Sequence, residues 1–235
     1  MILKIVWFYF NLLIATVFLG TIVIIFGLID YRKKYVGIIA RFWAKWLIKA
    51  SFVKVEVKGY EKIYKTKFPK LIFMANHSSA LDILIILSSI NHNIVFLAKK
   101  QLFPIPFLGW AMSAIGCIKV DRENKDKAKE SVDRAIKQIS NNENSIILFP
   151  EGTRSENGIL NKFKKGGFIL AIRTSIPVVP ISIKGANILN KKTSYSIQSG
   201  KVEMTIADPI YTVNYSEDKK EELLNRCYLT IKENL

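Results

Sequence analysis

The sequence has few of the residues on which several classes of protein depend. It has only two cysteines, Cys117 and Cys227, which lie far apart and form no CxxC pair. Neither a disulfide framework nor a cysteine-based metal site is therefore indicated, and this usage fits a reducing compartment. No G-x-S-x-G segment is present, so a serine hydrolase of that kind would lack its nucleophile.

Acidic residues are also scarce. The chain has 19 aspartates and glutamates against 35 lysines and arginines, which gives a net charge of +16. Such a balance predicts an anionic partner, which is nucleic acid, a membrane surface or a phosphorylated substrate. The first 55 residues contain eight basic residues and a single acidic one, Asp30, and they are unusually apolar. Basic charge beside apolar surface favours a membrane over nucleic acid, for which no recognised binding motif is present.

Formal charge is missing altogether from residues 5–29. As a helix this segment would be about 37 Å long, which exceeds the roughly 30 Å hydrocarbon core of a bilayer. The basic cluster at 31–34 follows directly, so we expect the rest of the chain on the cytoplasmic face of the membrane. A signal peptide is disfavoured by the length and by the lack of an A-x-A-like site, and a buried core helix is the other alternative. Whether the segment spans the bilayer or enters it from one side is left open.

Residues 35–52 predict a basic amphipathic helix. Arg41, Lys45 and Lys49 recur every four residues, and apolar and tryptophan side chains fill the other positions. This pattern is typical of a helix at the membrane interface, although a surface helix packed on the body of the protein is the alternative. We therefore expect residues 1–54 to form a membrane-anchoring two-helix module and residues 55–235 to form a separate domain.

From about residue 55 onward, short apolar runs alternate with helical patterns. Seven runs have the length and composition of strands: VEVKG, LIFMA, IVFLA, AIGCIKV, SIILF, PVVPISI and KVEMTIA. Helical patterns lie near residues 80–90, 105–113, 124–141, 165–174 and 216–233. This alternation predicts an α/β domain in which helices cover a mixed sheet. Ligands of such sheets bind beyond the carboxyl ends of strands, where the segments NHSSALD and FPEGTRS both begin.

In NHSSALD, His77 precedes Asp82 by five residues. A strand-to-helix turn between them would let the two side chains converge, so that Asp82 orients the imidazole and stabilises its charged form. The other ring nitrogen can then take a proton from a hydroxyl. We interpret Ser78 and Ser79 as turn or helix-cap residues, which leaves a substrate hydroxyl as the target. A buried structural histidine is the alternative, and it is the preferred interpretation of His92, which has no acid at a useful spacing.

FPEGTRS has the composition of an anion-binding turn. Gly152 permits a tight turn and close approach of a ligand, and Arg154 offers a planar fork suited to phosphate. Glu151 either anchors the loop by accepting hydrogen bonds or contacts a substrate hydroxyl. Further cations follow other apolar runs and are either solvated or part of a phosphate site: Lys99, Lys100 and Arg122.

NHSSALD and FPEGTRS, 67 residues apart from Asp82 to Phe149, together resemble motifs of the glycerolipid acyltransferase family. The resemblance is greatest to the 1-acylglycerol-3-phosphate acyltransferases and covers about residues 55–210. The segments AKKQLFPIPFLGW, GCIKVDR, FKKGG and IPVVPI occur in the order that this family shows. The resemblance implies acyl transfer from acyl-CoA or acyl-ACP to the free hydroxyl of lysophosphatidic acid at a membrane, without a cofactor or a metal.

The resemblance also implies roles for individual residues. His77 would be the general base and Asp82 its partner, and Lys99 or Lys100 would stabilise the oxyanion. The implied substrate-binding residues are Asn76, Arg122, Glu151, Gly152, Thr153 and Arg154. Two positions depart from the family pattern: Gln101 replaces a usual glutamate, and Lys119 replaces a large apolar residue, which puts the lining of the acceptor site in question.

Three alternatives to this function follow from the same features. In the first alternative, the chain is an acyltransferase whose acceptor is glycerol 3-phosphate or another lysolipid. In the second, the chain is a peripheral module that binds anionic lipid without chemistry. The third, a nucleic-acid binder, rests on net charge alone.

Overall fold

The strands form one mixed sheet. The computed structural model describes residues 2–29, 34–64, 66, 68–120, 125–140 and 144–235. Within them the strand order is β1-β7-β6-β2-β5-β3-β4. Each neighbouring pair is parallel except β6 and β7, which are antiparallel. The strands are β1 (Val53–Lys58), β2 (Ile72–Ala75), β3 (Ile94–Lys99), β4 (Ile118–Val120), β5 (Ser145–Leu148), β6 (Val178–Lys184) and β7 (Gly200–Ile206).

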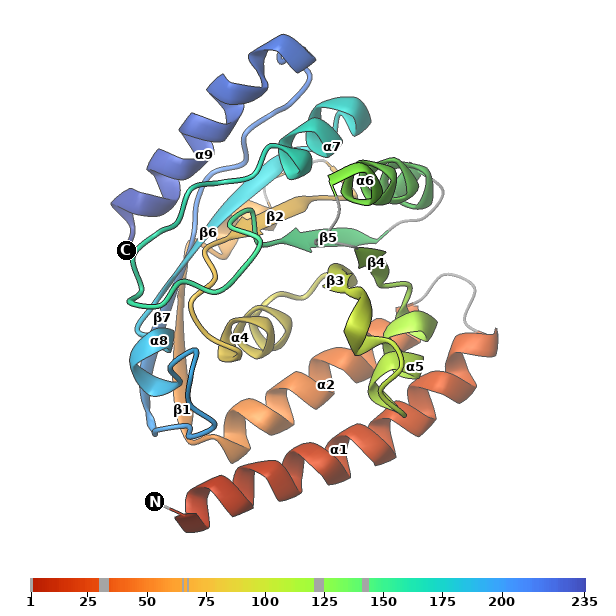
Figure 1. Ribbon diagram of the computed structural model, residues 1–235, viewed down its shortest axis with the longest axis vertical. Helices are drawn as coiled ribbons and strands as arrows, with labels where there is room; N and C mark the ends of the chain where they lie inside the picture. The colour runs from red at the N-terminus through yellow and green to blue at the C-terminus, as the bar shows by residue number, and fades with distance from the viewer. Residues whose placement is uncertain (1, 30–33, 65, 67, 121–124, 141–143) are drawn as a thin grey trace.

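Helices cover both faces of this sheet (Figure 1). One face packs on α6 (Lys125–Ser140), α7 (Gly166–Thr174) and α9 (Lys220–Glu233). The other face packs on α4 (Leu81–Ser89), below which lie α2 (Lys34–Ala50) and α1 (Ile2–Ile29). The shorter elements are α3 (Glu61–Tyr64), α5 (Leu108–Ile115), α8 (Ala186–Leu189) and the 3₁₀ helices η1 (Lys100–Leu102) and η2 (Glu217–Lys219). The predicted α/β architecture with a mixed sheet is confirmed.

The sequence of strand β2 does not alternate between apolar and polar residues, as a half-exposed strand would. All four of its residues are buried, because helices lie on both sides. Phe73 joins the core on the α4 side, whereas Ile72 and Met74 join the core on the side of α6, α7 and α9. A continuous apolar run is therefore what a central strand of this sheet requires.

The seven predicted strands are all present, but the run AIGCIKV is mostly not a strand. Its first two residues end α5, and Gly116 adopts a left-handed conformation (φ +98°) that terminates the helix. The amide of Cys117 donates to the carbonyl of Met112 at 2.9 Å, which completes the helix end. Strand β4 begins only at Ile118, so the glycine inside the run marks the boundary between helix and strand.

The two N-terminal helices form an antiparallel hairpin along the base of the molecule (Figure 1). Trp43 Nε1 donates to Thr16 Oγ1 at 3.1 Å, and Trp46 Nε1 donates to Asn11 Oδ1 at 2.9 Å. These tryptophans, which suggested a membrane interface, instead fasten α2 to α1. Helix α2 also buries Leu47 in the core that α4 shares, so the packing alternative describes it better.

The predicted boundary after residue 54 also falls inside a structural element. Strand β1 begins at Val53 and pairs with β7 along its whole length. Arg41, predicted in a polar stripe with Lys45 and Lys49, is half-buried and donates to the carbonyl of His92 at 3.0 Å and to Asn93 Oδ1 at 3.1 Å. Lys45 and Lys49 are exposed as that stripe requires.

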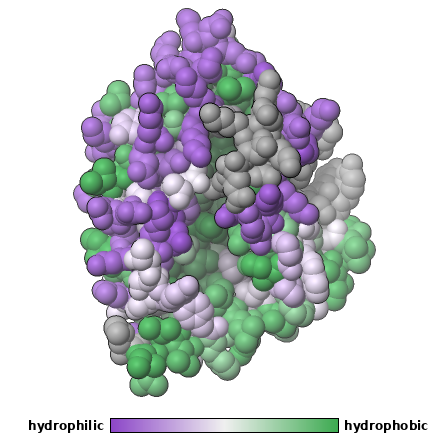
Figure 2. Space-filling view, in the orientation of Figure 1, coloured by the Kyte–Doolittle hydropathy of each residue, from purple (hydrophilic) through white to green (hydrophobic). Residues whose placement is uncertain are grey.

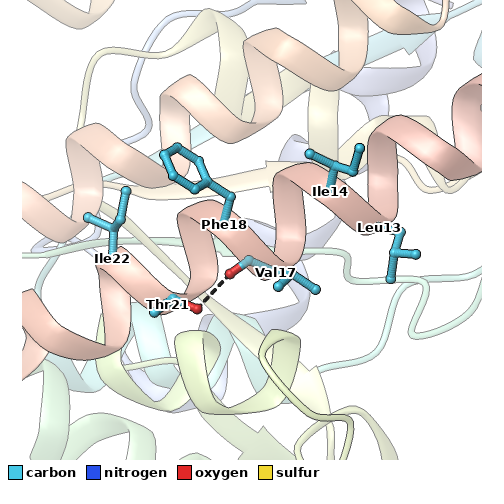
Figure 3. Close-up of a pocket in the computed structure, with 6 residues that line it drawn as sticks. All are labelled: Leu13, Ile14, Val17, Phe18, Thr21 and Ile22. Carbon is cyan, nitrogen blue, oxygen red and sulfur yellow. Dashed lines mark hydrogen bonds between the residues drawn. The ribbon is translucent and has the colours of Figure 1, made fainter.

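Helix α1 presents an apolar face to the outside. It is long and apolar enough to cross a membrane, and most of it is not buried. This face has an open depression of about 590 Å³ (Figure 3), which is lined by Leu13, Ile14, Val17, Phe18, Thr21 and Ile22. The hydroxyl of Thr21 donates to the carbonyl of Val17 at 2.7 Å, which satisfies the one hydroxyl in the depression. An apolar environment around this face therefore leaves that donor paired.

Candidate active site

His77 and Asp82 meet at the turn between β2 and α4. His77 Nδ1 lies 2.9 Å from Asp82 Oδ2. The Asp82 side chain is 0% exposed, whereas the His77 side chain is 14% exposed. The ring of His77 also stacks on Phe149, with 4.1 Å between ring centroids and 20° between planes. The structure thus brings the two predicted residues together and holds the imidazole in one orientation.

The aspartate is fixed by the turn that it closes. Its Oδ2 accepts main-chain hydrogen bonds from Ser78 at 2.7 Å and Ser79 at 2.9 Å, in addition to the imidazole. The Ser79 hydroxyl accepts from the amide of Leu81 and donates to Asn190 Oδ1, each at 3.1 Å. The serines therefore act as turn residues, as the sequence suggested. With Nδ1–H donated to Asp82, the lone pair on Nε2 is available to take a proton.

The main chain of His77 is bracketed by the FPEGTRS loop. Its amide donates to Glu151 Oε1 at 2.6 Å, and its carbonyl accepts from the amide of Ser155 at 2.7 Å. Glu151 Oε2 accepts from the amide of Asn161 at 2.9 Å. Since both oxygens are used in this way and Glu151 is only 3% exposed, its position matches the loop-anchor interpretation. Burial raises the pKa of the Glu151 carboxyl, and these hydrogen bonds oppose the shift.

The rest of the loop presents an unpaired cation. Gly152 has φ +76° and its amide donates to the carbonyl of Phe149 at 2.9 Å, which closes a tight turn. Thr153 is exposed and Arg154 is half-buried. Within the described residues, the Arg154 guanidinium has no hydrogen-bond or ion-pair partner. A partly desolvated guanidinium without an acceptor is suited to binding an anion such as phosphate.

Asn76 precedes the histidine but does not face the opening. Its Nδ2 donates to the carbonyl of Ile183 at 2.9 Å, and its Oδ1 accepts from the amide of Ile183 at 2.7 Å. The residue is 3% exposed. Its side chain therefore continues the pairing of β2 with β6, and this arrangement assigns it to positioning rather than to substrate contact.

The remaining predicted cations lie farther along the same edge of the sheet. Lys99 ends β3 and Lys100 begins η1, and β5 separates their strand from β2. Strands about 4.8 Å apart place β3 roughly 10 Å from β2. Lys100 and Lys119 border an open depression of about 530 Å³, where the Lys119 ammonium lies 4.9 Å from the centroid of the Phe103 ring. Arg122 lies outside the described residues.

The second histidine, His92, is not part of this site. His92 lies before β3, at the other end of that strand from Lys99, and its Nδ1 is 3.4 Å from Ser145 Oγ. Among the described residues, no group of three or more His, Cys, Asp or Glu side chains is arranged to hold a metal.

Figure 2 shows that the face seen in Figure 1 is hollowed near its middle, with hydrophobic residues in the hollow and hydrophilic residues above it.

Two contributors to the site did not stand out in the sequence. Phe149 stacks on the imidazole, and Asn190 Oδ1 accepts a hydrogen bond from the Ser79 hydroxyl. Phe149 is part of the FPEGTRS segment, so its position directly after a strand was the available signal. Asn190 has no such signal, because its contact depends on a partner 111 residues away.

Comparison with known proteins extends the likeness to the whole chain. The Acyltransferase family model matches residues 54–184. A chloroplastic 1-acyl-sn-glycerol-3-phosphate acyltransferase (BAT2) of Brassica napus is 36% identical over 182 residues, which are 77% of this chain and 52% of that protein. The chain thus spans about half the length of this plant relative. A 1-acyl-sn-glycerol-3-phosphate acyltransferase of Haemophilus influenzae is 30% identical, over 93% of this chain and 90% of its own.

A solved structure agrees with these sequence matches. The crystal structure of the 1-acyl-sn-glycerophosphate (LPA) acyltransferase PlsC from Thermotoga maritima superposes with a TM-score of 0.82 and 29% identity. The superposition covers 98% of this chain and 95% of the other, so it includes the N-terminal helices. With a family match over more than half of its residues, the chain belongs to the acyltransferase family.

Proposed function

We propose that the chain transfers an acyl group from acyl-CoA or acyl-ACP to the sn-2 hydroxyl of 1-acylglycerol 3-phosphate, giving phosphatidic acid. The observation that carries this proposal is the pairing of His77 with Asp82 on a turn whose main chain is bonded to the Arg154 loop. A base and a phosphate-binding cation held on one rigid unit suit an acceptor that carries both a hydroxyl and a phosphate. The names of the relatives support the same acceptor.

In the proposed reaction, His77 Nε2 takes the proton from the acceptor hydroxyl as its oxygen attacks the thioester carbonyl. The buried Asp82 carboxylate stabilises the imidazolium that results. The tetrahedral intermediate then collapses with cleavage of the C–S bond, and the imidazolium returns the proton to the departing thiolate. The products are an ester and a free thiol, so atoms and charge balance.

Cations complete this mechanism at two places. Arg154 binds the acceptor phosphate, beside the turn made by Gly152 and Thr153, and Arg122 contributes to the same site. Lys99 or Lys100 stabilises the negative oxygen that develops at the thioester carbonyl. General base catalysis of this kind contributes roughly 10²- to 10⁴-fold in rate, whereas enzymes typically accelerate reactions by about 10⁶-fold or more, so the cations must contribute as well.

We also propose that residues 1–54 hold the enzyme on a membrane, with the active domain on the cytoplasmic face. Helix α1 buries Phe8, Ala15, Leu19 and Val23 along one side, while its other side is apolar and exposed. Because one side of the helix is packed against the protein over most of its length, entry into the bilayer from one side fits better than a full span.

A thiol-release assay with lysophosphatidic acid, glycerol 3-phosphate and other lysolipids, each with both donors, tests the function. We expect release with lysophosphatidic acid above the other acceptors. His77→Ala is expected to abolish release while membrane binding and the circular dichroism spectrum stay unchanged. Lipid binding without thiol release by the wild type would instead support a binding module, and near wild-type turnover of His77→Ala would reject the base.

A further inference from the structure

Lys164 lies over the turn made by Gly152. A β-carbon built on Gly152 would be 2.9 Å from both Cε and Nζ of Lys164 and 3.1 Å from Cδ. The glycine thus serves two needs, because its left-handed backbone closes the turn and its missing side chain leaves room for the lysine. The ammonium is thereby placed against the backbone of the loop that carries Arg154.

The main chain beneath Lys164 is fixed to the same loop. Its amide donates to the carbonyl of Pro150 at 2.8 Å, and the amide of Asn161 donates to Glu151 at 2.9 Å. Glu151 in turn accepts from the amide of His77. Three hydrogen bonds therefore connect the backbone of residues 161–164 with the backbone of the base.

The exposed Lys164 side chain carries an unpaired charge, whereas the next two basic residues in the chain are paired. Lys165 pairs with Glu221, and Arg173 pairs with Glu217 and Asp133. In the part of the chain that the structure describes, neither the Lys164 ammonium nor the Arg154 guanidinium has an acidic or hydrogen-bonding partner. Arg154 follows Gly152 by two residues and the Lys164 ammonium lies against Gly152, so the two charges are suited to a doubly charged anion.

We propose that Lys164 is a substrate-binding residue whose ammonium, together with Arg154, holds the phosphate monoester of the acceptor. This inference rests on the proposed function. The donor also carries phosphate, but its phosphates are separated from the thioester by the long pantetheine arm. In lysophosphatidic acid the hydroxyl and the phosphate are on adjacent carbons, so the phosphate must bind close to the base. Only the acceptor therefore places phosphate beside the loop to which His77 is bonded.

Lys164→Met is the test variant, because it keeps a long apolar stem on Gly152 and removes only the charge. We expect the KM for lysophosphatidic acid to rise about 10-fold, as loss of a hydrogen bond to a charged group predicts, with the donor KM and kcat nearly unchanged. Lys164→Arg is expected to restore most of the affinity. Lys162→Met is the matched control, since Lys162 is an exposed lysine of the same loop, and its loss should leave all constants within about 2-fold.

A second variant separates charge from structure. Gly152→Ala strains the turn and moves the ammonium, so it should raise the acceptor KM, whereas Gly116→Ala strains a left-handed glycine at the end of α5 and serves as the control. A rise in the donor KM of Lys164→Met, or no change from Lys162→Met, would overturn the role of Lys164. If the wild-type protein fails to acylate lysophosphatidic acid, both the proposed function and this inference fail. If the wild type acylates it and Lys164→Met keeps the wild-type acceptor KM, only this inference fails.

Discussion

Glu151 accepts a 2.6 Å hydrogen bond from the amide of His77, although 74 residues separate the two in the chain. The same carboxylate reaches Asn161 with its other oxygen. A buried acid that holds two amides fixes the distance between the base and the Arg154 loop without touching either reacting group. Its expected contribution to the reaction is geometric.

Replacing Glu151 with glutamine tests that geometric contribution. Glutamine has one acceptor oxygen, so one of the two part-buried amides would face an NH₂ group, which costs about 1–3 kcal/mol of the free energy of unfolding. A shift of the His77 backbone should also lower kcat by about 10- to 100-fold. Chemical denaturation and thiol release measure the two effects. Glu156→Gln, which removes an exposed ion pair with Lys192, is the control, and equal results for both variants would contradict the role.

The raised pKa of Glu151 predicts a difference in pH dependence. Burial raises this pKa above its ordinary value of 4.5, so the folded chain keeps the proton to higher pH than the unfolded chain. The associated stability is fully present below 4.5 and is lost as the pH rises through the folded pKa. The free energy of unfolding of the wild type, minus that of Glu151→Gln, should therefore fall as the pH is raised above 4.5. A difference that rises or stays constant would show that burial does not dominate.

Asn76→Ala tests whether this asparagine positions the turn or contacts substrate. The variant leaves the amide and the carbonyl of Ile183 without their partner, so we expect a loss of about 2–4 kcal/mol in the free energy of unfolding. At a temperature where the variant is folded, the KM for lysophosphatidic acid should be close to that of the wild type. An unchanged stability with a raised KM would instead indicate substrate contact. Replacement of the exposed Asn157 by alanine serves as the control.

The limits of sequence reasoning are clear at Asn76. Both functional motifs were visible, because each follows a buried apolar run and combines residue types that rarely occur together. The His77–Asp82 contact was also predictable, since a turn between a strand and a helix joins residues that are close in sequence. The partner of Asn76 is 107 residues away, so a local pattern gives no means of telling a ligand contact from a backbone contact.

Helix α2 shows the same limit for membrane features. Tryptophans and lysines on an amphipathic helix have the composition of an interfacial helix, and this was the interpretation of residues 35–52. Trp43 and Trp46 instead find acceptors on α1, at Thr16 and Asn11. Those two residues were visible only as polar interruptions of an apolar run. Their role required knowing that the two helices lie side by side.

Asp82→Asn tests the charge of the aspartate apart from its shape. In the described part of the chain, Asp82 Oδ1 is buried without a hydrogen-bond partner, while Oδ2 accepts all three donors. An asparagine can therefore place its oxygen at the Oδ2 position and its NH₂ at the unpartnered one. The fold should survive, but kcat should fall by about 10²- to 10⁴-fold because the imidazolium loses its counter-charge. Thiol-release assays at saturating substrate give kcat. Asp208→Asn, which removes the charge of an exposed ion pair with Lys62, is the control. Activity within a few fold of the wild type would remove Asp82 from the mechanism.

The exposed face of α1 supplies a test of membrane binding that is independent of catalysis. Leu13 and Phe18 both line its open depression, and neither is needed for the core (Figure 3). A double variant with aspartate at both positions should lose most flotation with vesicles, because each charge at a bilayer-facing helix costs several kcal/mol. Thiol release from acceptor presented in detergent micelles should persist, since the dyad is on the far side of α2. Leu229→Asp places a charge on α9, at the opposite end of the molecule, and should leave flotation unchanged (Figure 1). Unimpaired flotation of the double variant would show that the bilayer meets another surface.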